Sequence, residues 1–493
     1  MTLSVSNTLT GERESFEPQD PDSVLLYYCG LTVSDQPHLG HARSWVHVDV
    51  MRRWLEHLGY SVRHIENFTD INEKIVARIG EDEYGDSEAA VATHFITEVI
   101  RDMRSLNLKR ATVHPRVSEH VPEIIELIET LLDRGYAYEA NGSVYFDVTT
   151  FDAYGTLSNQ SIEDIEAQGD PDERSEKRHP ADFALWKAGA VDPGSANEHR
   201  HEGLDPIEEP AGQTWESPWG EGRPGWHIEC SAMSMTHLDD HIDIHVGGQD
   251  LVFPHHENEI AQSEAATGER FADYWLHVRL LETEGEKMSS SLQNFFTVKN
   301  AVAEFGPNPI RMFLLSTAYS QRQSYTEAAL MEAVERWERL KRGYDRATEA
   351  ADSPDAVAKA EDTALREAIE TTERAFTEAM NDDFNTRAAL RELLDLVTAV
   401  NRHIDGTDTY DYPALAMAID RFETLGEGVL GFSFGGETSG DVRLADELIE
   451  LVLSVREHER EAGNFDRADE LRAELEELGI TIEDTDSGPT YRR

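Results

Sequence analysis

The two cysteines of this 493-residue chain are the side chains whose type and spacing point most directly to chemistry. Cys29 follows a short apolar run, and Cys230 stands 25 residues before His255. His255 and Glu259 are four positions apart, so on a helix they share one face, as two ligands of one metal ion must. Two thiolates, one imidazole and one carboxylate form a donor set suited to Zn²⁺. These four residues therefore predict a zinc site.

Other interpretations of the same residues remain open at this point. His255 and Glu259 could form an ordinary solvated helix face, and His256, three positions before Glu259, is a rival ligand. The cysteines could be buried apolar residues, since two thiols alone do not require a metal. A disulfide is not expected, because the sequence shows no secretory signal at its N-terminus.

The run from His38 to His41 (His-Leu-Gly-His) has the chemistry of a phosphate site. It stands between an expected strand and the start of an expected helix, where backbone N–H groups and the helix dipole favour an anion. The two imidazoles could donate hydrogen bonds to phosphate oxygens, and Gly40 would let a base or sugar approach the backbone. The alternative is a pair of surface histidines around a turn glycine.

A second run with phosphate chemistry is Lys-Met-Ser-Ser-Ser, residues 287–291, which follows a glycine-containing turn. The ammonium group of Lys287 and the hydroxyls of Ser289 and Ser290 suit the charge that develops on a leaving pyrophosphate. A polar surface loop is the alternative.

Residues 24–65, which must position the first of these motifs, are predicted to form a strand, a loop, a helix and a second strand. An apolar run from Val24 to Tyr28 predicts a buried strand, and residues 42–58 have the period of a helix that Gly59 ends. Residues 61–65 predict the next strand, so we expect a parallel nucleotide-binding sheet. Strand character returns at residues 241–246, so the sheet is expected to resume after an interruption.

The fold class expected from these patterns is α/β, a Rossmann-like parallel-sheet catalytic domain with a connective insertion, followed by an α-helical bundle and a small mixed C-terminal domain. Within the insertion, residues 121–134 predict a helix, residues 136–148 a hairpin, and the acidic stretch 160–212 a partly loose segment. The expected boundaries are 1–97 and 215–310 for the two halves of the catalytic domain, 98–214 for the insertion, 311–430 for the bundle, and 431–493 for the linker and last domain.

The net charge of −53 reflects 97 acidic against 44 basic residues spread along the whole chain. We interpret this as a surface adapted to high salt. Such a surface repels nucleic acid, so RNA binding would need local basic patches or an ionic strength near 1 M, where the Debye length is only about 3 Å. No apolar stretch approaches the roughly 18 residues that a membrane span requires, and we expect a cytoplasmic protein.

The two phosphate-type runs, in this order and about 250 residues apart, resemble the signature motifs of class I aminoacyl-tRNA synthetases, usually written HIGH and KMSKS. Leu39 replaces the usual Ile, and Ser290 stands where a second lysine is usual. The resemblance implies that His38, His41 and Lys287 act in catalysis. It also implies that Gly40, Ser289 and Ser290 contact ATP with its Mg²⁺, and that Lys287 carries more of the phosphate stabilisation here.

The four candidate zinc ligands coincide, residue by residue, with those of cysteinyl-tRNA synthetases. The resemblance runs from about residue 22 to the C-terminus and includes residues 28–33, 67–70, 182–187 and 247–254. It implies activation of L-cysteine with ATP and transfer to tRNA(Cys), with one Zn²⁺ selecting the thiol. Zinc binds a thiolate far better than an alcohol, whereas a pocket that sorts by size discriminates only about 10- to 200-fold.

The resemblance also implies contacts for each substrate. Thr69 and Asp70 would hold the amino group of cysteine, and Trp226 would form a wall of its pocket, although a buried core tryptophan is the alternative. The residues assigned to cysteine are Cys29, Gly30, Thr69 and Trp226, those added for ATP are Gly248 and Asp250, and those for tRNA are Arg467, Arg472, Arg492 and Arg493. A monomer is expected. A ligase that passes cysteine to a small amine and a non-catalytic RNA-binding paralogue are the competing hypotheses.

Overall fold

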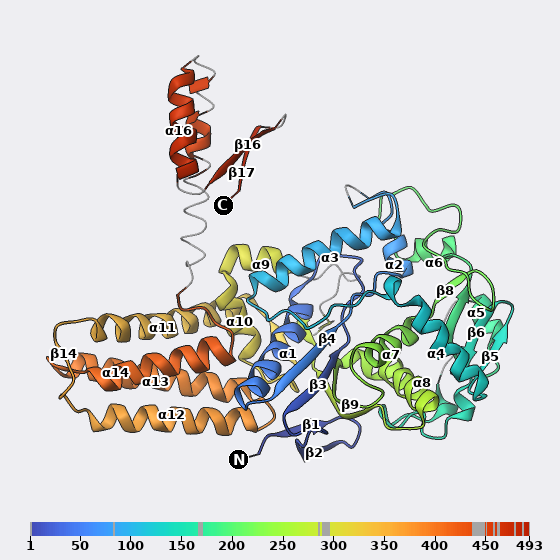
Figure 1. Ribbon diagram of the computed structural model, residues 1–493, viewed down its shortest axis with the longest axis horizontal. Helices are drawn as coiled ribbons and strands as arrows, with labels where there is room; N and C mark the ends of the chain where they lie inside the picture. The colour runs from blue at the N-terminus through green and yellow to red at the C-terminus, as the bar shows by residue number, and fades with distance from the viewer. Residues whose placement is uncertain are drawn as a thin grey trace. The chain divides into compact units, whose positions relative to one another are not determined.

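The computed structural model describes residues 2–81, 84–165, 171–283, 286–287, 296–435, 449, 451–456, 459–460, 464–477, 480–485 and 488–492. The chain forms two compact units, Met1–Phe434 and Gly435–Arg493, which are described separately below (Figure 1). Within the described residues no helix is both long and apolar enough to cross a bilayer.

A parallel sheet of four strands organises the first unit. Its order is β10-β9-β3-β4, with β3 at Ser23–Tyr28, β4 at Ser61–Glu66, β9 at Ile242–Gly248 and β10 at Ala272–Val278. Helix α1 (Leu39–His57) connects β3 to β4, and β9 returns to pair with β3. The predicted strand–helix–strand unit and the resumption of the sheet are therefore confirmed.

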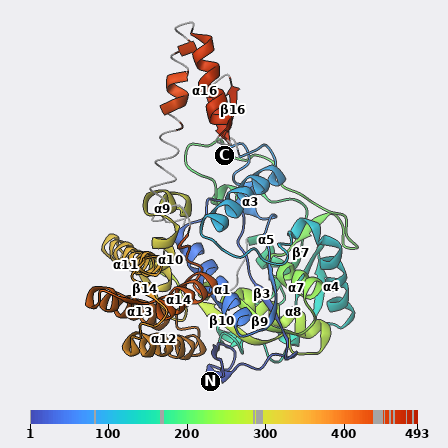
Figure 2. The same ribbon diagram turned by 60° about the vertical axis from the view of Figure 1, so that its left-hand side comes forward.

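Strand β3 carries apolar side chains on both faces, because both faces of a parallel sheet are covered by helices. Val24, Leu26 and Tyr28 pack on the side of α1, whereas Tyr27 and Cys29 pack with residues of α7 (Trp226–His237) and α8 (Glu257–Thr267). Figures 1 and 2 show α1 on one side of the sheet and α7 and α8 on the other. Since side chains alternate along a strand, this register aims Cys29 at α7 and α8.

The segment that interrupts the sheet contains helices and a second, antiparallel sheet, β5-β6-β7-β8. The predicted helix is α4 (Val121–Asp133), and the predicted hairpin is β5 (Ala137–Ala140) with β6 (Ser143–Phe146). The other strands and helices of this segment are α2 (Glu73–Val76), α3 (Glu88–Ser105), α5 (Pro171–Glu176), β7 (Phe183–Ala188), α6 (Pro193–Glu198) and β8 (Gly222–Pro224).

Strand β7 lies inside the acidic stretch 160–212 that the sequence predicts to be partly loose. Phe183, Leu185 and Trp186 are buried there, since β7 is an inner strand of the antiparallel sheet. The stretch therefore contains an ordered strand that the sequence analysis did not identify, because acidic residues surround its four consecutive apolar ones.

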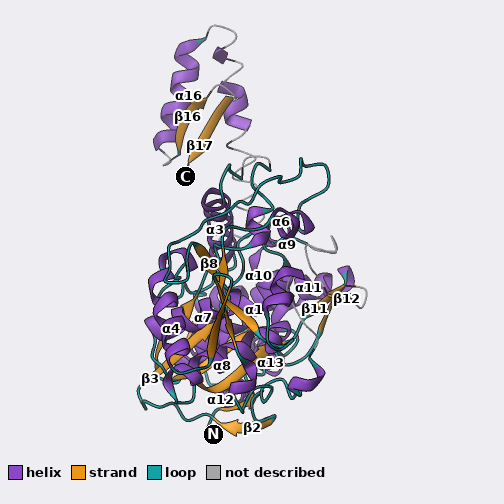
Figure 3. Ribbon diagram, turned by 90° about the vertical axis from the view of Figure 1, so that its right-hand side faces the viewer, coloured by secondary structure: helices purple, strands orange, loops and turns teal. Residues whose placement is uncertain are grey.

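Short elements complete the sheet region: β1 (Ser4–Asn7), β2 (Glu12–Ser15), β11 (Leu281–Thr283), β12 (Glu286–Lys287), α9 (Val298–Phe305) and β13 (Gln323–Tyr325). The predicted helical region follows as α10 (Pro307–Leu315), α11 (Glu327–Ala351), α12 (Thr363–Asn381), α13 (Thr386–Gly406) and α14 (Tyr412–Arg421), with two-residue strands β14 (Ala356–Val357) and β15 (Tyr410–Asp411). Figure 2 shows α11 to α14 side by side, and Figure 3 shows helices surrounding the strands of this unit.

The second unit contains α16 (Phe465–Glu477) and an antiparallel pair, β16 (Thr481–Thr485) with β17 (Gly488–Arg492). Leu453, Leu475 and Ile482 belong to its small core. A helix and two strands in this unit agree with the small mixed C-terminal domain expected from the sequence.

The edge strand β4 ends on a buried acid, Glu66, which is 5% exposed. Its Oε1 atom has no hydrogen-bond partner among the described residues, and burial raises the pKa of the carboxyl group to about 8. A carboxyl group that holds its proton more tightly when folded destabilises the folded state as pH rises from its unfolded pKa towards its folded one.

We therefore expect Glu66→Gln to raise the free energy of unfolding at pH 8 by about 2–4 kcal/mol more than at pH 5, because glutamine cannot ionise. Urea unfolding at both pH values measures the difference. Glu129→Gln, on the exposed face of α4, is the control and should show no such pH dependence. Equal effects of Glu66→Gln at the two pH values would contradict the prediction.

Candidate functional site

The four predicted metal ligands meet where the sheet contacts α7 and α8. Cys29 directly follows β3, and Cys230 lies in α7. His255 lies in the helical turn Val252–His256 that precedes α8, and Glu259 lies in the first turn of α8. One ligand atom from each lies within 4.8 Å of the corresponding atom of every other, and all four side chains are buried. Cys29 and Cys230 are 201 positions apart in the sequence, and they come together because the chain returns to the central sheet.

The separations inside this cluster suit a small tetrahedral cation. The Sγ atom of Cys29 lies 3.2 Å from Oε1 of Glu259, and Nε2 of His255 lies 3.1 Å from the same oxygen. A tetrahedron with metal–ligand bonds of about 2.0–2.3 Å has edges of about 3.3–3.8 Å, so only small shifts would be needed. The donor set and its geometry therefore fit Zn²⁺.

The pKa values of the two thiols are shifted in opposite directions. Burial, followed by a hydrogen bond with Cys230, raises the pKa of Cys29 well above its usual range. The hydrogen bond with Cys29 lowers the pKa of Cys230. A metal ion would compensate the cost of burying two thiolates, because it supplies the positive charge that the cluster lacks.

Two histidines that the sequence analysis did not select support this cluster. His245 on β9 lies with Nε2 3.0 Å from Oε2 of Glu259, and His227 on α7 lies with Nδ1 2.9 Å from Nδ1 of His255. Such contacts orient metal ligands. A histidine between the apolar residues Ile244 and Val246 of an expected strand was the sequence signal that could have indicated His245.

The rival ligand His256 lies in a second cluster of metal-ligating type, formed with Cys29, His245 and Glu259. Its Nδ1 atom, however, lies 2.8 Å from Nε2 of His277, and its Nε2 atom is 3.9 Å from Oε1 of Glu259. The set with both cysteines offers two sulfur ligands and shorter contacts, so it is the stronger candidate.

A cavity of about 530 Å³ opens beside this cluster. Residues from all three predicted groups line it, namely Cys29, Gly30, His38, Gly40, His41, Thr69, Trp226, Cys230, Gly248, Asp250 and His255. The carboxyl ends of β3, β4 and β9 meet at this edge of the sheet, which is where open α/β sheets bind ligands. The structure therefore gathers the predicted cysteine, ATP and metal residues of this set around one space.

In the loop after β3, Gly30 lies very close to the backbone of Asn67. A Cβ atom there would stand 1.7 Å from the carbonyl oxygen of Asn67, so no other residue fits this backbone. The side chain of Asn67 accepts hydrogen bonds from the Gly30 N–H at 2.9 Å and the Tyr27 hydroxyl at 3.1 Å. Asn67 thereby fixes the loop that carries Cys29.

His38 and His41 form the N-terminal cap of α1. Nδ1 of His38 accepts from the Gly40 N–H at 3.0 Å, and Nδ1 of His41 accepts from the His38 N–H at 3.3 Å. Because both Nδ1 atoms are acceptors, the proton of each neutral ring is on Nε2. Their rings stack with centroids 3.8 Å apart. Capping thus determines which nitrogen of each ring can donate to a phosphate.

The segment that follows the second signature run packs against this cap. The Leu39 N–H donates to the carbonyl of Phe296 at 3.0 Å, and the Val298 N–H donates to that of Pro37 at 2.9 Å. Lys287 lies in β12, whereas Ser289 and Ser290 lie outside the described residues. Backbone hydrogen bonds therefore connect the first predicted phosphate segment to residues 296–298, which follow the second predicted phosphate segment in the sequence.

Three further predictions concern the amino acid and the RNA. Trp226 is 39% exposed and its ring centroid lies 4.4 Å from that of His255, so the alternative of a buried core tryptophan is wrong. Thr69 lines the cavity described above, whereas the carboxylate of Asp70 accepts two hydrogen bonds from Ser118. Of the arginines assigned to tRNA, Arg467 and Arg472 lie on α16, Arg492 on β17, and Arg493 outside the described residues.

Comparison with protein families matches three consecutive segments of the chain. The class I (C) tRNA synthetase catalytic domain matches residues 15–335, the DALR domain residues 375–435, and the cysteinyl-tRNA ligase anticodon binding domain residues 444–492. Solved structures of low identity share the fold. Methionyl-tRNA synthetase of Mycobacterium tuberculosis has a TM-score of 0.61 at 15% identity, covering 84% of this chain and 92% of that one.

Relatives of known name match over the full length. The cysteine–tRNA ligases of Haloarcula marismortui and Halobacterium salinarum are 67% and 66% identical over 100% of both chains. That of Moorella thermoacetica is 42% identical over 99% of both. The chain therefore belongs to the cysteine–tRNA ligase family of class I aminoacyl-tRNA synthetases.

Proposed function

We propose that this chain activates L-cysteine with ATP to cysteinyl-adenylate and transfers the cysteinyl group to tRNA(Cys), with Zn²⁺ selecting the thiol. The observation that carries the proposal is the position of the cluster of Cys29, Cys230, His255 and Glu259. Three of these residues, Cys29, Cys230 and His255, line the same cavity as the histidine cap of α1. A thiol-binding centre and a phosphate-binding centre thus face one space.

Cys29, Cys230, His255 and Glu259 would hold the zinc ion. The bound ion supplies a site for a sulfur ligand, which serine and alanine do not offer. The shape of the cavity would contribute to the selection of cysteine. Gly30 lines it in the loop after β3, and Trp226 lines it beside His255.

The residues of α1 and β12 would act on ATP. The Nε2–H groups of His38 and His41, at the N-terminus of a 19-residue helix, suit phosphate oxygens. Lys287 would stabilise the departing pyrophosphate, Asp250 would accept hydrogen bonds from ribose hydroxyls, and Mg²⁺ would enter with ATP. The cysteine carboxylate then attacks the α-phosphate. Positioning and charge stabilisation account for catalysis without a covalent enzyme intermediate.

Transfer to tRNA involves the second unit, which matches an anticodon binding domain. With a net charge of −53, the chain would bind RNA where salt screens that charge or where basic residues gather locally. The haloarchaeal relatives support a surface adapted to high salt. We place the protein in the cytoplasm and expect a monomer.

Cysteine-dependent exchange of pyrophosphate into ATP tests the activation step. We expect exchange with cysteine, at least about 100-fold less with serine, and loss of exchange after chelation that Zn²⁺ restores. Cysteinylation of tRNA(Cys) tests the transfer step and separates this function from a ligase that uses a small amine. Absence of exchange in zinc-replete protein over a range of salt concentrations would contradict the proposal.

A further inference from the structure

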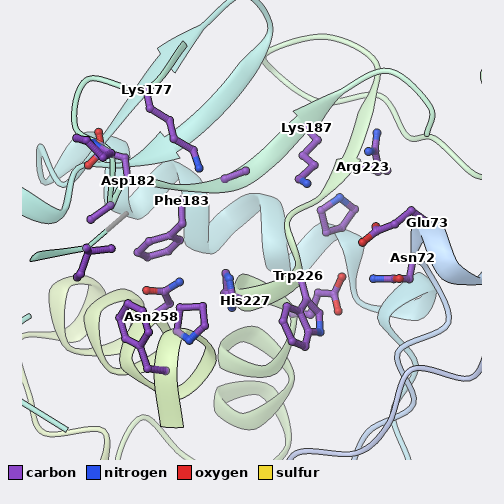
Figure 4. A pocket seen from close by; sticks show the side chains of 18 of the residues that line it. Asn72, Glu73, Lys177, Asp182, Phe183, Lys187, Arg223, Trp226, His227 and Asn258 are labelled. Atoms are coloured by element: carbon purple, nitrogen blue, oxygen red, sulfur yellow. The ribbon is translucent and has the colours of Figure 1, made fainter. Parts of the chain in front are cut away.

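Two further cavities lie in the first unit. One, of about 290 Å³, lies between the antiparallel sheet and the starts of α7 and α8 (Figure 4), and Trp226 lines both it and the cavity of the candidate site. The other, of about 170 Å³, lies on the face of the parallel sheet that α1 covers, opposite to the face from which Cys29 points. Residues of α1, β4 and the end of α3 line it, together with residues 107–110 and His114. We call it the α1-side cavity.

Three buried side chains of the α1-side cavity carry polar atoms that have no hydrogen-bond partner among the described residues. These atoms are Nε1 of Trp45, both ring nitrogens of His64, and Oε1 of Glu66. The three residues are between 2% and 5% exposed. His64 and Glu66 are two positions apart on β4, so they point to the same face of the sheet. Buried polar groups are almost always hydrogen-bonded, so four unpaired atoms around one cavity indicate a polar occupant.

The unpaired atoms offer donors and acceptors without a fixed charge at neutral pH. Burial lowers the pKa of His64 to about 3 and raises that of Glu66 to about 8. The His64 ring is therefore neutral, with one donor and one acceptor nitrogen, and the carboxyl group of Glu66 both donates and accepts. A metal ion does not fit, because neither residue belongs to a metal-ligating cluster in the described part of the chain. The interior suits the uncharged, hydrogen-bonding part of a ligand.

Four aromatic side chains line the α1-side cavity, namely Tyr28, Trp45, His64 and His114. His114 is fixed in place, since its Nδ1 atom lies 3.0 Å from the carbonyl oxygen of Glu66 and its ring stacks on Phe68 with centroids 5.0 Å apart. Flat heterocycles stack on such rings. A cavity of about 150 Å³ accommodates one benzene molecule, so the volume here suits a base with a single ring.

The mouth of the α1-side cavity is positively charged. Arg104 and Arg110 line it, are exposed, and form no ion pair among the described residues. Two arginines without an acidic partner on one cavity are unexpected in a chain with 97 acidic and 44 basic residues. The carboxylate of Asp49, which also lines the cavity, is already paired with Arg53 and Arg311. The mouth therefore suits an anion, and a terminal phosphate, with a charge of about −1.5 to −2, matches two guanidinium groups.

We propose that the α1-side cavity binds a free pyrimidine nucleotide, with its base against Trp45 and the carboxyl group of Glu66 and its phosphate at Arg104 and Arg110. This binding function goes beyond the reaction proposed above. Tyr28, which directly precedes the candidate zinc ligand Cys29, lines both this cavity and that of the candidate site. A nucleotide in the α1-side cavity would therefore contact the strand that carries Cys29 without occupying the candidate site.

Calorimetric titration with cytidine 5′-monophosphate tests the contacts at the mouth. ATP is present throughout, so that the candidate site is filled. We expect Arg104→Ala/Arg110→Ala to weaken binding of the nucleotide at least about 10-fold and binding of cytidine less than about twofold, because cytidine lacks the phosphate.

Arg374→Ala/Arg387→Ala, on α12 and α13, is the matched control. Both arginines are also exposed and form no ion pair in the described part of the chain, but they lie outside the α1-side cavity. This variant should bind cytidine and its monophosphate as the wild type does.

Two substitutions of Glu66 test the interior. Glu66→Leu removes both the donor and the acceptor, so it should weaken binding of cytidine and of its monophosphate equally, at least about 10-fold. Glu66→Gln keeps an amide that donates and accepts, so its affinities should stay within about threefold of the wild type. A single cooperative urea transition for each variant shows that it is folded.

Four results would overturn the inference. Wild-type protein could fail to bind cytidine 5′-monophosphate, or could bind adenosine 5′-monophosphate or inorganic phosphate equally well, which would exclude a site for a single-ring base. The arginine variant could weaken cytidine and nucleotide equally, which would place the phosphate elsewhere. Glu66→Leu could bind as the wild type does. Displacement of the nucleotide by tRNA(Cys) would assign the cavity to RNA in place of a free nucleotide.

Discussion

Replacing Cys230 by serine is expected to lower cysteine-dependent pyrophosphate exchange at least about 100-fold, a loss of about 2.7 kcal/mol or more in transition-state stabilisation. The Sγ atom of Cys230 belongs to the buried cluster with Cys29, His255 and Glu259. A serine hydroxyl is a harder and much less acidic ligand than a thiol, so it does not replace the sulfur on Zn²⁺. Zinc content measured by mass spectrometry should fall together with exchange.

The same substitution should also reduce discrimination against serine. Without a thiol-selective centre only the shape of the cavity distinguishes the two amino acids, which limits the ratio of their kcat/KM values to about 10- to 200-fold. Exchange measured with each amino acid over a range of concentrations gives this ratio directly.

Ser234→Ala supplies a matched control for Cys230→Ser. Ser234 lies one turn further along α7, it is also buried, and its hydroxyl has no hydrogen-bond partner among the described residues. The control should retain zinc, exchange and discrimination. Should Cys230→Ser retain full zinc content and full selectivity for cysteine, the assignment of the metal site would be wrong.

The candidate site shows which information a sequence carries. The spacing of His255 and Glu259 is local, so helix geometry alone predicts that they share a face. The approach of Cys29 to Cys230 is not local, and it was inferred from the chemistry of the donor set and from the resemblance to a known family. His245 was missed because its contact with Glu259 depends on how β9 packs against α8.

The fold shows the same limit. The parallel sheet and the helical region were predictable, because apolar periodicity is written into each segment. Strand β7 was not, since four apolar residues inside an acidic stretch form a strand only by pairing with β6 and β8. The hydrogen bonds of His38 and His41 to the backbone of the cap also needed coordinates, although the sequence placed both residues at a helix N-terminus.

A buried ionic contact connects α1 to α10. Asp49 on α1 accepts hydrogen bonds from Arg53 at 2.9 Å and from Arg311 on α10 at 2.7 Å, and all three side chains are at most 8% exposed. Although burial alone would raise the pKa of Asp49, the two guanidinium groups lower it below its ordinary value. Arg311 also donates to the carbonyl oxygens of Leu106 and Leu430.

We expect Asp49→Ala to lower the free energy of unfolding of the first unit by about 3–5 kcal/mol, because it leaves two buried guanidinium groups without their anion. Glu56→Ala on the same helix is the control. Glu56 also pairs with two cations, Arg52 and Lys109, but it is 26% exposed, and its loss should cost at most about 1 kcal/mol.

Urea unfolding at low and high salt separates the two cases. Salt screens the exposed pairs of Glu56 and should shrink the effect of its removal, whereas the buried pairs of Asp49 are shielded from ions and its effect should persist. A cost for Asp49→Ala no larger than for Glu56→Ala would contradict the prediction. The buried contact would then not be what fixes α1, and with it the histidine cap at the N-terminus of α1, against α10.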